Sequence, residues 1–114
     1  MTDPAFTLIT GDRTELLGEL AIEARAVRTR RIFKGNGVTL IRLALDAGTV
    51  LKEHTAAAPI LVEVLSGHAT MLFGTEAIDM PAGAIIHIEA SIPHSVEAIT
   101  PTQLLLTHTA RPAR

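Results

Sequence analysis

After residue 20 the chain consists of short strand-like runs, and the first of them alternates apolar and polar residues with a period of two. The alternation starts at residues 20–26, where Glu23 and Arg25 separate apolar neighbours, and it continues with a change of register through residues 27–34. This pattern is typical of a strand with one buried and one exposed face. The sequence therefore predicts strand structure over residues 20–34.

A weaker signal precedes this region. Thr14 stands ahead of Leu16, Leu17 and Leu20, a spacing that predicts one short helix capped by the threonine hydroxyl. Gly18 interrupts the pattern, because glycine is an unfavourable residue in a helix interior. We expect no helix of ordinary length after residue 20.

Turn residues divide the rest of the chain into short strands. Asn36-Gly37 predicts a tight hairpin, since these two residues tolerate positive φ angles. Glycine or proline follows most of the later apolar runs. The predicted strands cover residues 38–45, 49–54, 60–65, 68–73, 77–80, 84–88, 95–99 and 103–108. Many short strands separated by turn residues indicate an all-β sandwich or barrel.

Composition sets the size and the material of the core. The 114 residues are enough for one domain with a single core, so we predict one domain over residues 1–114. Hydrophobic residues make up 47% of the chain, but there are only three Phe and no Trp or Tyr. Aliphatic side chains must therefore fill the interior.

Charge and missing residue types exclude several functions. The net charge of −2 gives no general attraction to nucleic acids or anionic membranes. The chain has no Cys, which excludes disulfides, thiolate nucleophiles and zinc fingers. No apolar run approaches the roughly 18 residues that a membrane span requires, and the polar start MTDPAFTLITGDR does not resemble a signal peptide. We expect a cytoplasmic protein that binds neither nucleic acid nor membrane.

A local basic cluster does not change this expectation. No aromatic residue interleaves its arginines for stacking on bases, and acidic residues stand just upstream in the sequence. We therefore interpret the cluster as a solvated or intersubunit strand face. It comprises Arg25, Arg28, Arg30, Arg31 and Lys34.

Four short motifs between residues 48 and 94 resemble the cupin superfamily. They are Gly48-x5-His54, Val64-Leu-Ser-Gly67, Pro81-Ala-Gly83 and Pro93-His94. The first cupin motif reads G-x5-H-x-H-x(3,4)-E-x6-G, and the second reads G-x5-P-x-G-x2-H-x3-N. The similarity spans about residues 38–108 and is strongest to small single-domain bacterial cupins.

The match to the cupin metal motif is incomplete. Ala56 stands at the place of the second histidine, and Ile60 stands at the place of the glutamate. In the second motif, Glu89, Ser91 and Ala98 replace the proline, glycine and asparagine. Of the four metal-ligand positions, only His54 and His94 are kept.

The resemblance implies a fold, an assembly and a site. The implied fold is a double-stranded β-helix, or jelly-roll barrel, with its core at residues 38–108 and with residues 20–34 completing the barrel or a dimer sheet. Homodimers are common in the family, and we expect one here. We expect Leu61 and Leu65 to form an apolar outer face that a second copy covers. Enzymatic cupins hold Fe, Mn, Ni or Zn with three histidines and a glutamate.

Two surviving ligand positions are too few for a tightly held metal, because catalytic sites supply at least three protein ligands. We therefore expect no cofactor. If a metal binds, His54 and His94 need a third ligand, for which His87 and His108 are the candidates. Glu63 is out of phase with Ile60 and cannot replace the missing glutamate.

These residues leave three functions open. The preferred hypothesis is a protein that binds a small molecule in a pocket lined by His54, His94, Ala56, Ile60 and Val62. The first alternative is a metal-dependent dioxygenase or isomerase with a recruited third ligand. The second is a non-catalytic oligomerisation or accessory protein. No nucleophile–base arrangement can be read from the sequence, so catalytic residues are not assigned.

Overall fold

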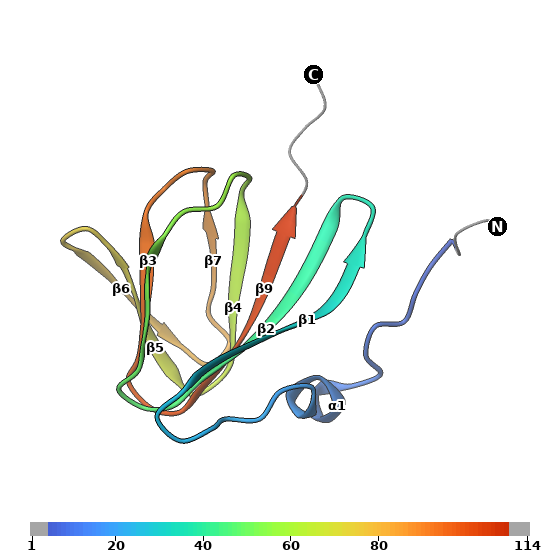
Figure 1. Cartoon of the computed structure of the whole chain (residues 1–114), viewed down its shortest axis with the longest axis horizontal. Coiled ribbons are helices and arrows are strands. Elements are labelled where there is room, and N and C mark those ends of the chain that lie inside the picture. Colours follow the sequence, from blue (N-terminus) through green and yellow to red (C-terminus); the bar gives the residue numbers. More distant parts are fainter. Residues whose placement is uncertain (1–4, 110–114) are drawn as a thin grey trace.

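The computed structural model describes residues 5–109, which form one short helix and nine strands (Figure 1). No helix within that range is long and apolar enough to cross a membrane. The elements are α1 (Arg13–Gly18), β1 (Val27–Gly35), β2 (Val38–Leu45), β3 (Val50–His54), β4 (Ile60–Ser66), β5 (His68–Phe73), β6 (Glu76–Pro81), β7 (Ile85–Ile88), β8 (His94–Ala98) and β9 (Thr102–Thr109).

The strands build two antiparallel sheets. One sheet has the order β1-β2-β9-β4-β7 and the other has the order β3-β8-β5-β6. The inner faces of both sheets supply one core of aliphatic side chains and methionines, as the aromatic-poor composition requires. The predicted all-β jelly-roll fold is confirmed. The core consists of Leu43, Leu45, Ile60, Val62, Val64, Ala69, Met71, Met80, Ile88, Val96, Ala98 and Leu104.

The strands predicted after residue 37 are present, and each of their ends lies within one residue of its predicted position. The hairpin between β1 and β2 forms at Asn36-Gly37, and Gly35 pairs with Val38 across it. Only Gly37 of the two turn residues takes a positive φ, at 93°.

The prediction of a strand over residues 20–26 is wrong. This segment is a loop, and strand structure begins at Val27. Arg25 has a φ of 61°, and its N–H donates to the Asp46 carboxylate at 2.7 Å. The Ala26 N–H donates to the Glu23 carbonyl at 3.1 Å, which closes a turn. The turn gives the N–H groups of Arg25 and Ala26 hydrogen-bond acceptors. The segment therefore needs no partner strand, although its residues alternate.

The short helix exists, but Thr14 is not its cap. The side chain of Asp12 accepts a hydrogen bond from the Glu15 N–H at 2.8 Å, the usual spacing between a cap and the third helical residue. The helix contains Leu16 and ends at Gly18, so Leu20 lies beyond it.

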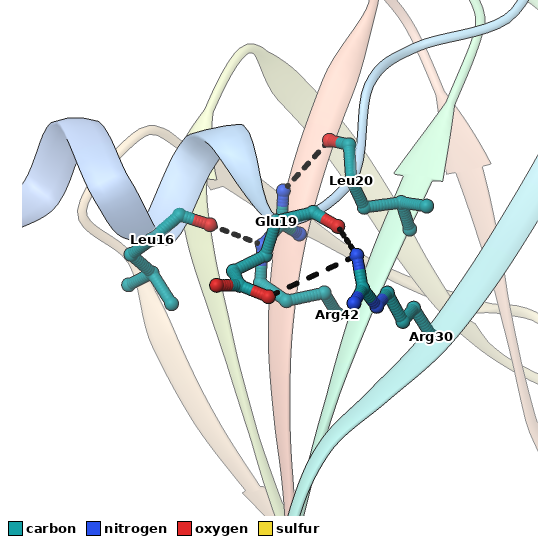
Figure 2. A network of polar contacts seen from close by, with 5 residues as sticks. All are labelled: Leu16, Glu19, Leu20, Arg30 and Arg42. Carbon is teal, nitrogen blue, oxygen red and sulfur yellow. Dashed lines mark hydrogen bonds and ion pairs between the residues drawn. The ribbon is translucent and has the colours of Figure 1, made fainter. Parts of the chain in front are cut away.

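Arg42 joins the N-terminal segment to the sheet of β2. Its side chain is 0% exposed although its neighbour Leu43 faces the core, because residues 16–20 cover this part of the outer face. The guanidinium donates to the carbonyls of Leu16 (3.1 Å) and Leu20 (3.4 Å), as Figure 2 shows. It also donates to the Leu43 and Leu104 carbonyls and to the amide oxygen of Gln103.

Burial lowers the pKa of Arg42, and the nearby Glu19 carboxylate opposes this effect. Glu19 also lies 3.9 Å from Arg30, whose guanidinium donates to the Glu19 carbonyl at 2.9 Å (Figure 2). Arg28 pairs with Glu23 at 3.4 Å. Two members of the basic cluster are therefore paired with the acidic residues upstream of them.

Candidate functional site

A change of register in β3 places His54 on the inner face of its sheet. Leu51 lies opposite Val96 of β8, and His54 lies opposite His94, so three steps along β3 match two steps along β8. In a regular strand, residues three apart face opposite sides. The extra residue returns His54 to the face of Leu51, which packs against the core.

The two imidazoles contact each other directly. Their ring centroids are 4.3 Å apart and the rings are inclined by 62°, an edge-to-face arrangement. The Phe73 ring also lies near His94, with a centroid distance of 6.5 Å. His94 is only 3% exposed, whereas His54 is exposed. The pair therefore has one member in the interior and one at the surface.

Each ring is oriented by a backbone carbonyl two residues before it. Nδ1 of His54 lies 2.8 Å from the Lys52 oxygen, and Nδ1 of His94 lies 2.8 Å from the Ile92 oxygen. A carbonyl oxygen only accepts hydrogen bonds, so both Nδ1 atoms must donate. In the neutral ring, Nε2 then keeps its lone pair. Metal-binding and ligand-binding histidines are commonly oriented by such a second hydrogen bond.

His108 reaches the same region from the opposite sheet. It alternates with the buried Leu104 and lies opposite Ile60 of β4, so it faces inward. Burial is the largest cause that lowers its pKa, and the imidazoles of His54 and His94 lower it further. The end of β9 and the start of β4 lie at the upper end of the molecule in Figure 1, where β3 also ends. Three histidines from two sheets thus gather at one end of the fold, and we call them the histidine cluster.

The other predicted third ligand lies elsewhere. His87 pairs with Leu61, and both are exposed on the outer face of the sheet. Nδ1 of His87 is 3.9 Å from the Glu89 carboxylate. The neighbours of His87 on β7 have the opposite orientation, since Ile86 packs against the core and Ile88 belongs to it. Of the two proposed third ligands, His108 faces the interior and His87 does not.

The remaining predicted site residues lie on the inner side. Ile60 and Val62 are 2% and 3% exposed and belong to the core. Ala56 is partly buried against that core, and its carbonyl accepts from the Ser91 N–H at 2.8 Å. Their assignment to the wall of a ligand pocket stays a prediction.

One departure from the cupin motif falls at a strained backbone position. Ser91, which stands where that motif has glycine, has a φ of 66° in the left-handed region. Glycine adopts this region without steric cost, whereas serine does not. Glycine would therefore suit the backbone at this position better than serine does.

Within residues 5–109, no group of three or more His, Asp or Glu side chains is arranged to hold a metal ion. The histidine cluster in its present rotamers is therefore a set of neighbouring imidazoles rather than a formed metal centre. Sequence reasoning missed the register change in β3 and the two Nδ1 hydrogen bonds. Neither leaves a signal in residue spacing, because both depend on backbone geometry.

No protein-family model and no curated protein matches the chain. Solved structures do. A protein of unknown function from Streptococcus pyogenes has a TM-score of 0.77 and 26% identity, over 98% of this chain and 93% of that one. A cupin superfamily protein from Desulfitobacterium hafniense has a TM-score of 0.79 and 16% identity, over 84% and 88%. The DMSP lyase DddQ from Ruegeria pomeroyi has a TM-score of 0.69 and 14% identity, over 77% and 49%. These similarities establish the fold and assign no activity.

Proposed function

We propose that this chain, whose fold is that of a small cupin, binds a small and partly apolar molecule at the histidine cluster. The observation that carries the proposal is the contact between His54 and His94, with both Nδ1 atoms bound to the backbone and both Nε2 atoms left for a ligand. Two oriented polar atoms next to an aliphatic interior are the usual ingredients of a small-molecule site.

The two parts of the site contribute different amounts to affinity. Apolar ligand surface contributes about 25 cal/mol for each Å² removed from water. One hydrogen bond to an imidazole contributes about 1 kcal/mol, and it also fixes the orientation of the ligand. Aliphatic residues lie beside the cluster on both sheets. Ile60 lies opposite His108, and the pair of Leu51 and Val96 is the next one along β3 and β8 from the pair of His54 and His94.

A thermal-shift screen of small molecules tests the proposal. We expect a hit to raise the melting temperature of the wild type and to lose most of that effect in His54→Ala and in His94→Ala. His87→Ala is the matched control, because this histidine lies on the outer face and its loss should leave the shift unchanged. A set of hits that stabilises all four proteins equally would show that the ligand binds elsewhere.

A metal-dependent activity is the second candidate function, and the position of His108 favours it. His108 supplies from β9 the third nitrogen that the cupin motif supplies from the place of Ala56. Three imidazoles can hold Zn²⁺ or a similar ion and leave a coordination position open. Side-chain rotation would be needed first, since the described residues hold no formed metal group.

We expect the purified protein to keep no stoichiometric Fe, Mn, Ni or Zn after dialysis against a mild chelator, as measured by elemental analysis. Two firmly placed ligands compete poorly with a chelator. Stoichiometric metal that His108→Ala loses and His87→Ala keeps would contradict this expectation and establish the second candidate. Metal retained by both variants would point to a site outside the histidine cluster.

A homodimer is the third part of the proposal. Leu65 does not need a second copy to cover it, contrary to our expectation, because it is 3% exposed within one chain and its carbonyl accepts from Arg13. Leu61 and Ile85 remain 39% and 62% exposed on the outer face of neighbouring strands. Phe6 and Leu8 are also exposed in the N-terminal segment, which adds apolar surface for a partner.

Light scattering should therefore give twice the mass of the 12.1 kDa chain at micromolar concentration. The double variant Leu61→Lys and Ile85→Lys should reduce this value to the mass of one chain, because charge replaces the apolar contact. A matched pair, Lys52→Ala and Glu53→Ala, changes exposed residues of the other sheet and should remain dimeric. A wild type of single-chain mass would contradict the proposal.

A further inference from the structure

The chemical class of the ligand follows from the hydrogen bonds of the histidine pair. The Lys52 and Ile92 carbonyls bind Nδ1 of His54 and His94 at 2.8 Å each and set the same tautomer in both neutral rings. Each Nε2 therefore faces the ligand as a hydrogen-bond acceptor. In an isolated imidazole the proton can move from one ring nitrogen to the other. In His54 and His94 this change would break the hydrogen bond from Nδ1 to the backbone carbonyl.

Neither Nε2 has a hydrogen-bond partner among residues 5–109. His94 is only 3% exposed, yet the described part of the chain contains no buried side-chain nitrogen or oxygen that lacks a partner. Nε2 of His94 therefore has open space beside it that a water or a ligand atom can occupy. Two accessible lone pairs on adjacent rings need donors.

Resting on the proposed small-molecule site, we propose that the ligand presents a hydroxyl group to His54 and His94, and that carbonyl and carboxylate groups are disfavoured. A hydroxyl hydrogen donates to an imidazole lone pair, whereas a ketone or an ionised carboxylate offers only further lone pairs. An acceptor placed against an acceptor loses a hydrogen bond to water and gains none in return.

His108 completes the recognition of a hydroxyl. No hydrogen bond within the described residues ties its ring to the backbone, so either ring nitrogen can carry the proton. A hydroxyl oxygen that donates to Nε2 of one neighbour can accept from the N–H of His108.

Four probes with one apolar ring separate these chemistries: phenol, anisole, acetophenone and benzoate. Each is titrated into the chelator-treated wild type at about pH 8, where imidazoles of ordinary pKa are neutral, and ring NMR signals report binding. We expect phenol to bind about fivefold more tightly than the other three, the ratio that one hydrogen bond provides. Because one hydroxyl donates to one Nε2 at a time, this preference should shrink in His94→Ala or in His54→Ala, disappear when both are replaced, and persist in His87→Ala.

Long-range proton–nitrogen spectra of the free protein test the premise independently. We expect protonated Nδ1 and unprotonated Nε2 in both His54 and His94. The opposite tautomer in either ring, or equal affinity for phenol and acetophenone, would overturn the inference and leave the proposed binding site standing. If none of the four probes moves any signal of the histidine cluster at millimolar concentration, both the inference and the proposed site are contradicted.

Discussion

Replacing Arg42 by methionine should lower the free energy of unfolding by about 3 kcal/mol. Arg42 is 0% exposed and donates to the carbonyls of Leu16 and Leu20, which hold the N-terminal segment against the outer face of the sheet. Methionine fills a similar volume but donates nothing. The Leu20 carbonyl would then be buried without a partner among residues 5–109, at about 1–3 kcal/mol, and the Leu16 carbonyl would keep only its bond from the Glu19 N–H at 3.3 Å.

An opposing effect limits this loss. The described residues place no carboxylate within hydrogen-bond distance of the Arg42 guanidinium, and its burial lowers the pKa because the charge has lost its water. Removing the charge recovers part of that desolvation cost. The stranded Leu20 carbonyl, together with the Leu16 carbonyl and the Gln103 amide that each lose a donor, outweighs the recovery, so the net sign is destabilising.

Urea denaturation of wild type and variant measures the difference. Arg30→Met is the matched control, because Arg30 lies opposite Arg42 on β1 and its side chain is 59% exposed. Exposed ion pairs contribute less than about 1 kcal/mol, so the control should lose little. Equal effects of the two substitutions would show that apolar packing replaces the guanidinium.

The second large effect is expected at Ile60, the place that the cupin motif gives to a glutamate. Ile60 is 2% exposed and lies between His108 of β9 and Ile88 of β7. In metal-free protein, Ile60→Glu should destabilise by about 3–5 kcal/mol, since it removes aliphatic packing and buries a carboxyl group. Thermal or urea unfolding in the presence of a chelator measures this loss.

A control variant and a pH series separate the effect of the charge from the effect of the side-chain shape. Ile60→Gln introduces a polar group of the same size without charge, and its cost should not depend on pH. Burial raises the pKa of a glutamate at this position, so Ile60→Glu should lose further stability as the pH rises above about 4.3, the unfolded value. Identical pH profiles for the two variants would show that the carboxylate escapes to solvent.

Combining Ile60→Glu with Ala56→His extends the test. Together with His54 and His94, the double variant carries the four ligand types of the cupin motif, and we expect Zn²⁺ to recover much of its stability. Recovery should be absent in the wild type at the same metal concentration. If the double variant shows no stabilisation by metal, Ala56 and Ile60 do not occupy the ligand positions that the motif spacing assigns.

Much of the fold could be predicted because its strands are amphipathic. The strands after residue 37 are short apolar runs, and glycine or proline marks most of their boundaries, so local chemistry and tertiary structure agree there. Residues 20–26 alternate more regularly but form a loop, because a strand also needs a partner and none is available. The burial of Arg42 was equally hidden, since it depends on residues 16–20, which are distant in the sequence.

The candidate site shows a similar division. Motif spacing singled out His54 and His94, and the structure places them in contact. The choice between His87 and His108 needed strand orientation, which the structure supplies through the pairing of His108 with Ile60. The acceptor character of both Nε2 atoms could not be predicted, because it depends on backbone oxygens two residues before each ring.

The central claim is that the histidine cluster is the ligand site, and the five histidines of the chain provide a direct test. His54, His94 and His108 belong to the cluster, whereas His87 is exposed on an outer face and His68 pairs with Asp79 at 2.5 Å outside it. The measurement is a histidine-ring NMR titration of the wild type with a hit from the thermal-shift screen. We predict that the signals of His54, His94 and His108 move together with one dissociation constant while those of His68 and His87 stay in place. Movement confined to His68 or His87, or a saturating hit that moves none of the three cluster signals, would contradict the account.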